Sequence, residues 1–300
     1  MPSAIHDFVP DPHAARVGGA AQVTVYTPAS AMRQPRLMVR SMWADLKGSR
    51  ELAWRLAVRD IRAQYRQSLL GYLWAFIMPL ATTLAWVFLN ASGIVRIADT
   101  GLPYPAYVLT GTMLWQMFVE ALQSPLQQVG ASRSMLTKLN FPRESIILSG
   151  MVKWWFNALV KLIIIVPVLL FFGVFPDQHI VLVPVALLGI LLVGMAIGLL
   201  LAPLGMLYTD VGRAIPVLAQ FAMFITPVVF AMPKGGFTLR LFELNFMTPV
   251  ILTGRAWLTG GVSPLPVDFA VVCGVAFLIL LLGWVIYRIT MPVLIERMSS

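Results

Sequence analysis

Long apolar stretches separated by short polar connectors fill the chain from residue 72 onward. A helix of about 20 apolar residues crosses the roughly 30 Å hydrocarbon layer of a bilayer. The pattern therefore predicts an all-α membrane protein with about six transmembrane helices inside one transmembrane domain, residues 72–291. The expected spans are residues 72–95, 104–129, 144–172, 180–207, 214–232 and 267–290. Close helix contacts in the fourth span are expected at Gly189, Gly194 and Gly198.

An amphipathic segment, residues 49–71, precedes the first span. Trp54, Val58 and Ile61 recur there at steps of four and three, and arginines repeat the same spacing one residue later. Because one position is about 100° of helix, a basic stripe lies beside an apolar one. This pattern is typical of a helix in the headgroup plane; the alternative is an ordinary solvated helix on a soluble domain. The stripe expected to contact lipid phosphate consists of Arg55, Arg59, Arg62 and Arg66.

The two ends of the chain contain no apolar stretch of spanning length. Residues 1–48 are expected to form a disordered cytoplasmic tail, and residues 292–300 a short cytoplasmic tail. Residues 1–36 hold no apolar core of signal-peptide length, so we expect no cleavable signal.

Shorter helices are predicted in two connectors. After the second span, Ser132 can cap a short helix that Asn140 and Pro142 would end. Before the last span, residues 237–246 and 249–258 are too short and too mixed to span. They are expected to form short re-entrant or interfacial helices.

Composition and charge support a membrane location. Apolar residues make up 59% of the chain and charged residues 12%, against roughly 45–50% and 25% in soluble domains. The net charge is +9, and 16 of the 22 Lys and Arg residues would be cytoplasmic if the N-terminus is inside, against four outside. This asymmetry predicts an integral membrane protein with both termini in the cytoplasm. The charge then indicates topology and contact with membrane lipids, with no binding of nucleic acid.

The motifs of common active sites are missing from the sequence. No G-x-x-x-x-G-K-[ST], HExxH or GxSxG motif occurs. The three histidines lie in the N-terminal tail or a loop, Cys273 is the one cysteine, and the acidic residues are scattered singly. We therefore expect no catalytic residue, no metal site and no cofactor in this chain.

Charges inside the expected spans are a sharper signal. Lys153 and Lys161 lie about two turns apart in the third span, and Glu120 lies in the second. Each charge at the bilayer centre costs about 2.5–3.5 kcal/mol on insertion scales. Lys153 can extend to the inner surface, whereas Lys161 is expected to face protein and to pair with Glu120. Such a pair could stabilise the contact between the two helices or take part in transport.

Aromatic residues are abundant, with 17 Phe, 9 Trp and 7 Tyr. Packing or lipid contact is the ordinary role of each ring. Sugars, however, stack their C–H faces on aromatic rings while their hydroxyls meet polar groups. The residues expected to line a translocation path are Trp86, Phe88, Glu120, Lys161, Phe221, Phe224 and Phe230.

Three stretches resemble a known family. They are RDIRAQYRQSLLGYLW at residues 59–74, LTKLNFPRE at residues 136–144, and YTDV at residues 208–211, followed by ITPV at residues 225–228. In this order and context the chain resembles the permease subunit of ABC-2 type polysaccharide exporters, the O-antigen, capsule and teichoic acid group. The resemblance covers about residues 50–291.

The resemblance implies a homodimer of this permease and two ATP-binding subunits, which would hold the ATP and Mg. It implies an interface helix at residues 51–70, a coupling helix at residues 132–143, and re-entrant helices within residues 233–266 that shape the outer mouth. The chain departs from the family pattern at Thr209, where Arg is frequent, and at Asn245-Phe246, where Asn-Pro is usual. The residues expected to contact the ATPase are Ser132, Met135, Leu136, Lys138, Leu139, Phe141, Pro142 and Arg143.

These observations predict the permease of an ATP-driven exporter that moves a lipid-linked polysaccharide across the inner membrane. An exporter of the same architecture for a drug or small lipid is the nearest alternative, because both need a wet or aromatic path. A membrane-bound glycan enzyme is a further alternative, which turnover of a glycolipid without an ATPase would favour. A passive channel fits less well, since the sequence offers no selectivity ring.

Overall fold

The computed structural model describes residues 35–66, 73–95, 97–98, 100–138 and 141–299. Within these ranges every regular element is a helix, as predicted. The elements are α2 (Pro35–Gly48), α3 (Arg50–Arg66), α4 (Trp74–Ala91), α5 (Tyr104–Ala131), α6 (Arg133–Lys138), α7 (Glu144–Phe171), the 3-10 helix η2 (Gln178–Leu182), α8 (Val183–Leu207), α9 (Thr209–Phe224), α10 (Gly236–Leu244), α11 (Met247–Thr259) and α12 (Pro266–Ser299).

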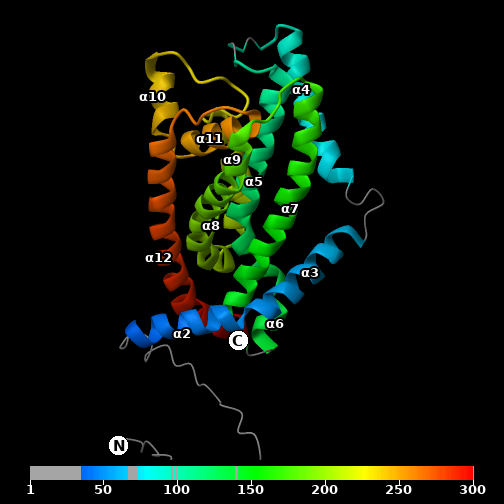
Figure 1. The fold of residues 1–300 in the computed structure, drawn as a ribbon. Helices are drawn as coiled ribbons and strands as arrows, with labels where there is room; N and C mark the ends of the chain where they lie inside the picture. Colours follow the sequence, from blue (N-terminus) through cyan, green and yellow to red (C-terminus); the bar gives the residue numbers. More distant parts are fainter. Residues whose placement is uncertain (1–34, 67–72, 96, 99, 139–140, 300) are drawn as a thin grey trace, which may run out of the picture.

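The long helices form a bundle that shorter helices cover at both ends (Figure 1). α5, α7, α8 and α12 run along the long axis of the molecule, with α2, α3 and α6 at the end where the chain terminates. We call this the basal end, and the opposite end, where α10 and α11 lie, the distal end. α2 lies across the bundle at the basal end, and α3 rises obliquely from it along α7.

Glycines bring α5 and α8 into close contact at the centre of the bundle. A Cβ atom added at Gly198 would lie 2.2 Å from the carbonyl oxygen of Leu122, and one added at Gly194 would lie 2.4 Å from the Cβ of Ala121. Gly189 has the same relation to α12, where the ring of Phe269 would be 2.8 Å away. The predicted close contacts of these three glycines are therefore confirmed.

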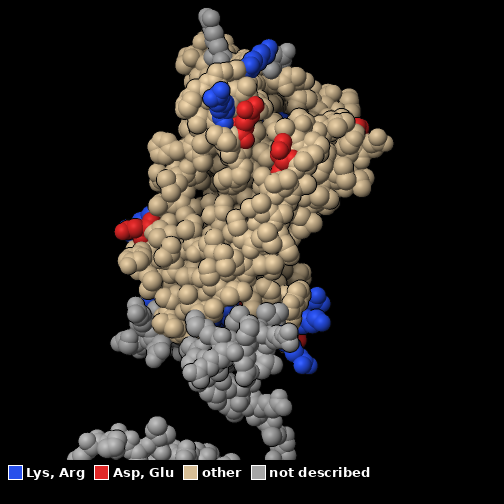
Figure 2. Space-filling view, turned by 90° about the vertical axis from the view of Figure 1, so that its left-hand side faces the viewer, with Lys and Arg blue, Asp and Glu red and all other residues tan. Residues whose placement is uncertain are grey.

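Several helices have the length and apolar surface of membrane spans. Among the described residues, Glu144–Phe171, Gln178–Leu207 and Pro266–Leu294 are long and apolar enough to cross a bilayer, and Phe76–Ala91 is a shorter apolar helix. Figure 2 shows a broad, mostly uncharged middle on the α12 side, with charged side chains gathered toward its ends and one edge. This surface suits hydrocarbon, although the count of six spans remains a prediction.

The expected fifth span, residues 214–232, differs from the structure. α9 begins earlier, at Thr209, and ends at Phe224. Pro227 has no backbone N–H and disfavours helical geometry in the residue before it, so the helix does not continue. Asn245 stabilises the turn that follows, because its Nδ2 donates to the carbonyl oxygen of Ile225 at 2.9 Å.

The expectation of a disordered tail is wrong for residues 35–48, and the last helix continues beyond the expected span of residues 267–290. Pro35–Gly48 forms α2, and α12 continues without interruption to Ser299. The two helices support each other, since Trp43 packs edge-on against Trp284 with ring centroids 6.2 Å apart. Local composition at either end gives no sign of a partner so distant in sequence.

An ion cluster joins three helices at the basal end. The guanidinium of Arg288 on α12 donates to Glu144 at the start of α7, to Asp45 of α2 at 2.6 Å, and to the Ser41 hydroxyl at 3.1 Å. Arg288 and both carboxylates are largely shielded from solvent. The cluster therefore fixes the basal end of α12 against α7 and α2.

A second buried arginine fixes the distal end. The two short helices predicted before the last span are present as α10 and α11, and Arg255 of α11 is only 4% exposed. Its guanidinium donates to the carbonyl oxygens of Pro227 at 2.8 Å and Val228 at 2.7 Å, and lies 3.6 Å above the ring of Tyr107. Arg255 thus joins α11, α5 and the turn after α9.

We expect Gly198→Ala to destabilise the bundle. Its methyl group meets backbone at 2.2 Å, so α5 and α8 must separate, at a cost of about 1–3 kcal/mol. Gly274→Ala on α12 is the matched control, because nothing lies within 4 Å of its added Cβ and alanine favours a helix. Thermal unfolding in detergent should show a lower midpoint for Gly198→Ala only; equal midpoints would contradict the close contact.

Candidate functional site

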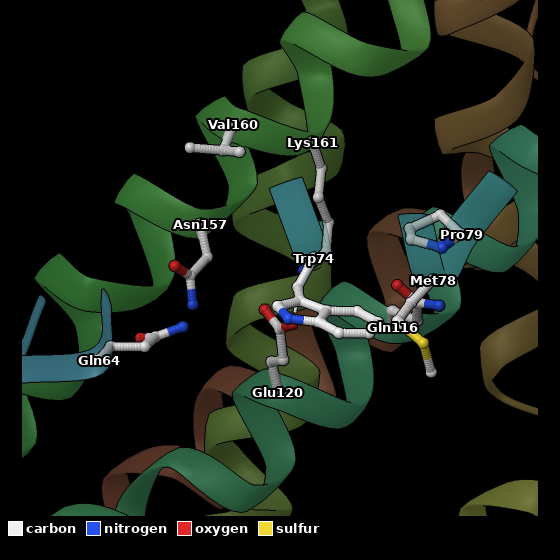
Figure 3. A pocket seen from close by; sticks show the side chains of 9 residues that line it. All are labelled: Gln64, Trp74, Met78, Pro79, Gln116, Glu120, Asn157, Val160 and Lys161. Atoms are coloured by element: carbon white, nitrogen blue, oxygen red, sulfur yellow. Dashed lines mark hydrogen bonds and ion pairs between the residues drawn. The ribbon is translucent and has the colours of Figure 1, made fainter. Parts of the chain in front are cut away.

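A polar cavity lies among α3, α4, α5 and α7. It has a volume of about 270 Å³, and Figure 3 shows the side chains that line it. Amide, carboxylate, ammonium and indole groups from all four helices face this space. Its polar and indole side chains are those of Gln64, Trp74, Gln116, Glu120, Asn157 and Lys161, and the apolar side chains of Met78, Pro79 and Val160 complete the lining.

An ion pair between α5 and α7 forms one wall of the cavity. Lys161 Nζ donates to Glu120 Oε1 at 2.5 Å, so the pairing predicted from sequence is confirmed. The Lys161 side chain is 7% exposed and that of Glu120 is 40% exposed. The other carboxylate oxygen, Glu120 Oε2, is covered and makes no hydrogen bond with any described residue. The pair therefore retains an unused acceptor.

A second cavity of about 220 Å³ shares Gln64, Glu120 and Asn157 with the first, so the two spaces are contiguous. It adds Gln128 and Lys153 to the polar lining. This arrangement explains why α5 is unusually polar for a span: Gln116, Gln127 and Gln128 face the space between helices.

α5 and α7 are fixed beside this cavity by packing and by one buried hydrogen bond. Trp154 of α7 is 2% exposed, and its Nε1 donates to the carbonyl oxygen of Met117 on α5 at 2.7 Å. Gly150 of α7 lies against Ser124, whose Oγ would be 2.5 Å from an added Cβ. The spacing of Glu120 and Lys161 is thus set by the contact of their two helices.

Three of the expected path aromatics meet away from the polar cavity. Trp86 of α4 lies 5.6 Å from Phe230 and 6.4 Å from Phe224 of α9, measured between ring centroids. Phe224 and Phe230 are also 6.4 Å apart. Phe88 and Phe221 lie outside this cluster, each 68% exposed on the surface of α4 or α9. The expected path residues therefore fall into two regions, the polar cavity and an aromatic cluster (Trp86, Phe224, Phe230).

α3 covers the predicted amphipathic segment as far as Arg66 and has three faces. Ala53, Leu56 and Ala57 are buried, on the side that packs on α7. Trp54, from the apolar stripe noted in the sequence, is 61% exposed, so that stripe is not the buried face. The buried side was missed because two of its three residues are alanines, although their spacing is helical. The basic stripe forms the third face, with Arg55 paired to Glu51 at 2.5 Å.

α6 lies beside α3 at the basal end. The carbonyl oxygen of Ser132 accepts from the backbone N–H of Leu136 at 2.9 Å, and Leu136 is buried. Arg59 of α3 reaches across to α6, where its Nη1 lies 3.2 Å from Met135 Sδ. These contacts connect the two basal helices that the sequence singled out.

The remaining expected coupling residues are distributed around the start of α7. Pro142 is exposed, and its carbonyl oxygen accepts from the backbone N–H and the hydroxyl of Ser145, at 3.1 and 2.7 Å. Arg143 and Phe141 are half-buried, and Lys138 ends α6. Leu139 lies outside the described residues. Among the residues that are described, no three His, Cys, Asp or Glu side chains gather in a group that could hold a metal ion.

Comparison with known proteins gives a consistent set of similarities. The family model described as ABC-2 type transporter matches residues 51–256. An O-antigen export system permease protein RfbA of Myxococcus xanthus is 27% identical over 176 residues, covering 58% of this chain and 66% of that protein. Its counterpart of the same name in Klebsiella pneumoniae is 24% identical over 174 residues, with the same coverage.

A capsule export protein is also similar. The capsule polysaccharide export inner-membrane protein CtrC of Neisseria meningitidis serogroup B is 28% identical over 137 residues, which cover 44% of this chain and 50% of that protein. The chain thus matches just under two thirds of the length of the O-antigen relatives and half of the capsule relative.

We expect Lys161→Met to destabilise the protein because it leaves the Glu120 carboxylate without its cation. Breaking a buried pair costs about 3–5 kcal/mol, and the exposure of Glu120 reduces the expected loss to roughly 1–3 kcal/mol. The double variant with Glu120→Gln should lose less stability than the sum of the single variants. Thermal unfolding of the wild type, both single variants and the double variant in detergent measures this coupling; additive losses would contradict a stabilising pair.

Proposed function

This chain belongs to the ABC-2 type transporter family, and on that premise we propose that it is the permease subunit of an ATP-driven exporter of a lipid-linked polysaccharide. The observation on which the proposal rests is the match over residues 51–256, together with relatives named as O-antigen and capsule export proteins. The transported molecule is a glycan of that kind, carried across the inner membrane.

In this proposal the basal end faces the cytoplasm. Most Lys and Arg residues then lie in cytoplasmic segments, as the positive-inside rule requires. α3 would rise obliquely from the headgroup level, with its basic stripe toward lipid phosphate and the exposed Trp54 toward the apolar layer. Both termini are then cytoplasmic.

ATP hydrolysis is supplied by a separate ATP-binding subunit, which holds the nucleotide and Mg. The sequence contains no phosphate loop of its own. α6 and the start of α7 are the docking surface for that subunit. Because Arg59 contacts Met135, a displacement of α6 also reaches α3. Ser132, Leu136 and the residues as far as Arg143 transmit the same displacement to α5 and α7.

The glycan moves between two copies of this permease. Phe88 and Phe221 project from the surface of α4 and α9, close in sequence to the aromatic cluster of Trp86, Phe224 and Phe230. If the α4 and α9 surfaces of two copies face each other, they would line a passage with rings on which sugars can stack. Rings bind sugar faces without requiring one sequence of sugars, so the passage suits a long polymer.

Copurification and export together test this function. The permease should copurify with the ATP-binding protein encoded beside it when the two are expressed together. Deletion of the permease gene should leave the cell surface without the lipid-linked glycan. Normal delivery in the deletion strain would overturn the proposal. Transport of a small amphiphile with no change in surface glycan would favour the alternative exporter.

We expect the double variant Arg59→Ala/Arg62→Ala to reduce export. An arginine near the anionic membrane surface contributes about 1 kcal/mol, so the loss of two corresponds to about 2 kcal/mol and should lower export by up to about thirtyfold. Membrane insertion should not change, because the apolar spans are intact. Arg213→Ala, which removes an exposed arginine of α9, is the matched control and should export normally. Surface glycan staining normalised to membrane-inserted protein measures the effect; unchanged export of the double variant would contradict the role of the stripe.

A further inference from the structure

We propose that the polar cavity among α3, α4, α5 and α7 binds one uncharged sugar ring, as a recognition site within a single permease. The identity of the ligand rests on the proposed function, whereas the place and shape of the site are those of the cavity itself. The cavity differs in place from the aromatic cluster: its last lining residue on α4 is Pro79, and Trp86 lies seven residues further along that helix, about 10 Å.

The depth of the cavity favours an occupant that forms hydrogen bonds. Lys161 lies 17 residues into α7, about 25 Å along a helix that is long and apolar enough to span the bilayer. Polar and charged side chains at such depth are costly unless they face one another, water or a ligand. Gln64, Gln116 and Asn157 line the space in addition to the ion pair. The ion pair accounts for two of these polar groups, and an occupant of the space can hydrogen-bond to Gln116 and Asn157.

The hydrogen-bonding groups match hydroxyls. Each side-chain amide presents an acceptor oxygen and two N–H donors, and a sugar hydroxyl is both donor and acceptor. Gln64 and Asn157 approach the cavity from one side and Gln116 and Glu120 from the other (Figure 3). Glu120 Oε2 adds an acceptor that no described residue uses. A ring with hydroxyls on several carbons can meet groups on both sides at once.

The charges favour a neutral ligand over a phosphate. Lys161 Nζ, the ammonium of the first cavity, is already paired with Glu120 at 2.5 Å. The spare carboxylate oxygen would repel an anion and would accept a hydrogen bond from a hydroxyl. Lys153 lines the neighbouring 220 Å³ space, not the 270 Å³ space beside Trp74.

The size and the indole wall favour a single ring. A volume of about 270 Å³ equals that of about nine liquid water molecules, which is room for one sugar and its hydroxyls. Trp74 is 48% exposed and its ring lies beside Glu120 (Figure 3). An indole face next to a carboxylate offers a stacking surface and a hydroxyl acceptor to the same ring.

Thiol labelling of the full chain in lipid nanodiscs tests this proposal. Cys273 is the one native cysteine, so Cys273→Ser gives a background without thiols. Val160→Cys places a thiol at the cavity without removing any of its hydrogen-bonding groups, and Leu159→Cys, the preceding residue of α7 and 54% exposed, is the matched control. Met78→Cys on α4 is a second cavity variant for the case that Val160→Cys does not elute as a single species.

A hydrophilic thiol reagent should label the cavity cysteine at least about tenfold faster than Leu159→Cys, because only a solvated thiol forms the reactive thiolate readily. At least one of a panel of neutral hexoses, deoxyhexoses and N-acetylhexosamines should slow this labelling several-fold, whereas inorganic pyrophosphate should not. Slow labelling at the cavity position, or no protection by any sugar of the panel, would overturn the proposal. Protection by pyrophosphate alone would overturn it in favour of an anion site.

These measurements need no ATPase, so their outcome is separable from that of the export experiments. A chain that exports glycan but is not protected by sugar contradicts the cavity site and leaves the proposed function intact. A chain that is protected but exports no glycan supports sugar binding at this cavity and contradicts the transport of a polysaccharide.

Discussion

The close contact of α5 and α8 is the constraint on which the other helix positions depend. Lipid tails are as apolar as the helices, so burial of apolar side chains does little to hold helices together in a bilayer, and close packing must do so. Gly194 and Gly198 let α8 reach the backbone of α5 at Ala121 and Leu122. α7 packs on α5, α12 packs on α8, and α11 packs on both central helices. A side chain larger than hydrogen at Gly198 would therefore displace more than one contact.

Because α5 packs on α8 through one side, its other side is available for polar groups. Leu122 and Pro125 lie against Gly198 of α8, whereas Glu120 and Gln116 line the cavity toward α4 and α7. A helix of this kind combines a tightly packed side with a solvated one, and its sequence consequently has lower hydropathy than the other long helices. The ion pair to Lys161 joins the polar side of α5 to α7 without filling the space beside it.

The parts of the fold that sequence predicted are those determined by local pattern. The long apolar helices, the two short distal helices and the pairing of Glu120 with Lys161 follow from length, hydropathy and the cost of a charge at depth. Contacts between distant residues were not predictable in the same way. The sequence pattern offers no partner for Arg288, yet it meets Glu144 and Asp45, which lie 144 and 243 residues away in sequence. The pattern likewise gives no sign that Arg255 is buried, which the carbonyl groups exposed where α9 ends make possible.

The two buried arginines divide the molecule into a fixed part and a part with fewer constraints. Arg288 joins α12 to α7 and α2, and Arg255 joins α11 to α5, so the helices around the central contact are fixed at both ends. α4 and α9 bury few side chains among the described residues, with Ile215 and Ala219 the buried positions of α9. Elements with few buried contacts open or shift at lower free energy than a packed core. Trp86 and Phe224 of the aromatic cluster lie on these less constrained helices, whereas the polar cavity is bounded on two sides by the fixed helices α5 and α7. A movement that widens a passage beside α4 and α9 can therefore leave Glu120 and Lys161 paired, while it shifts the α4 wall of the cavity at Trp74.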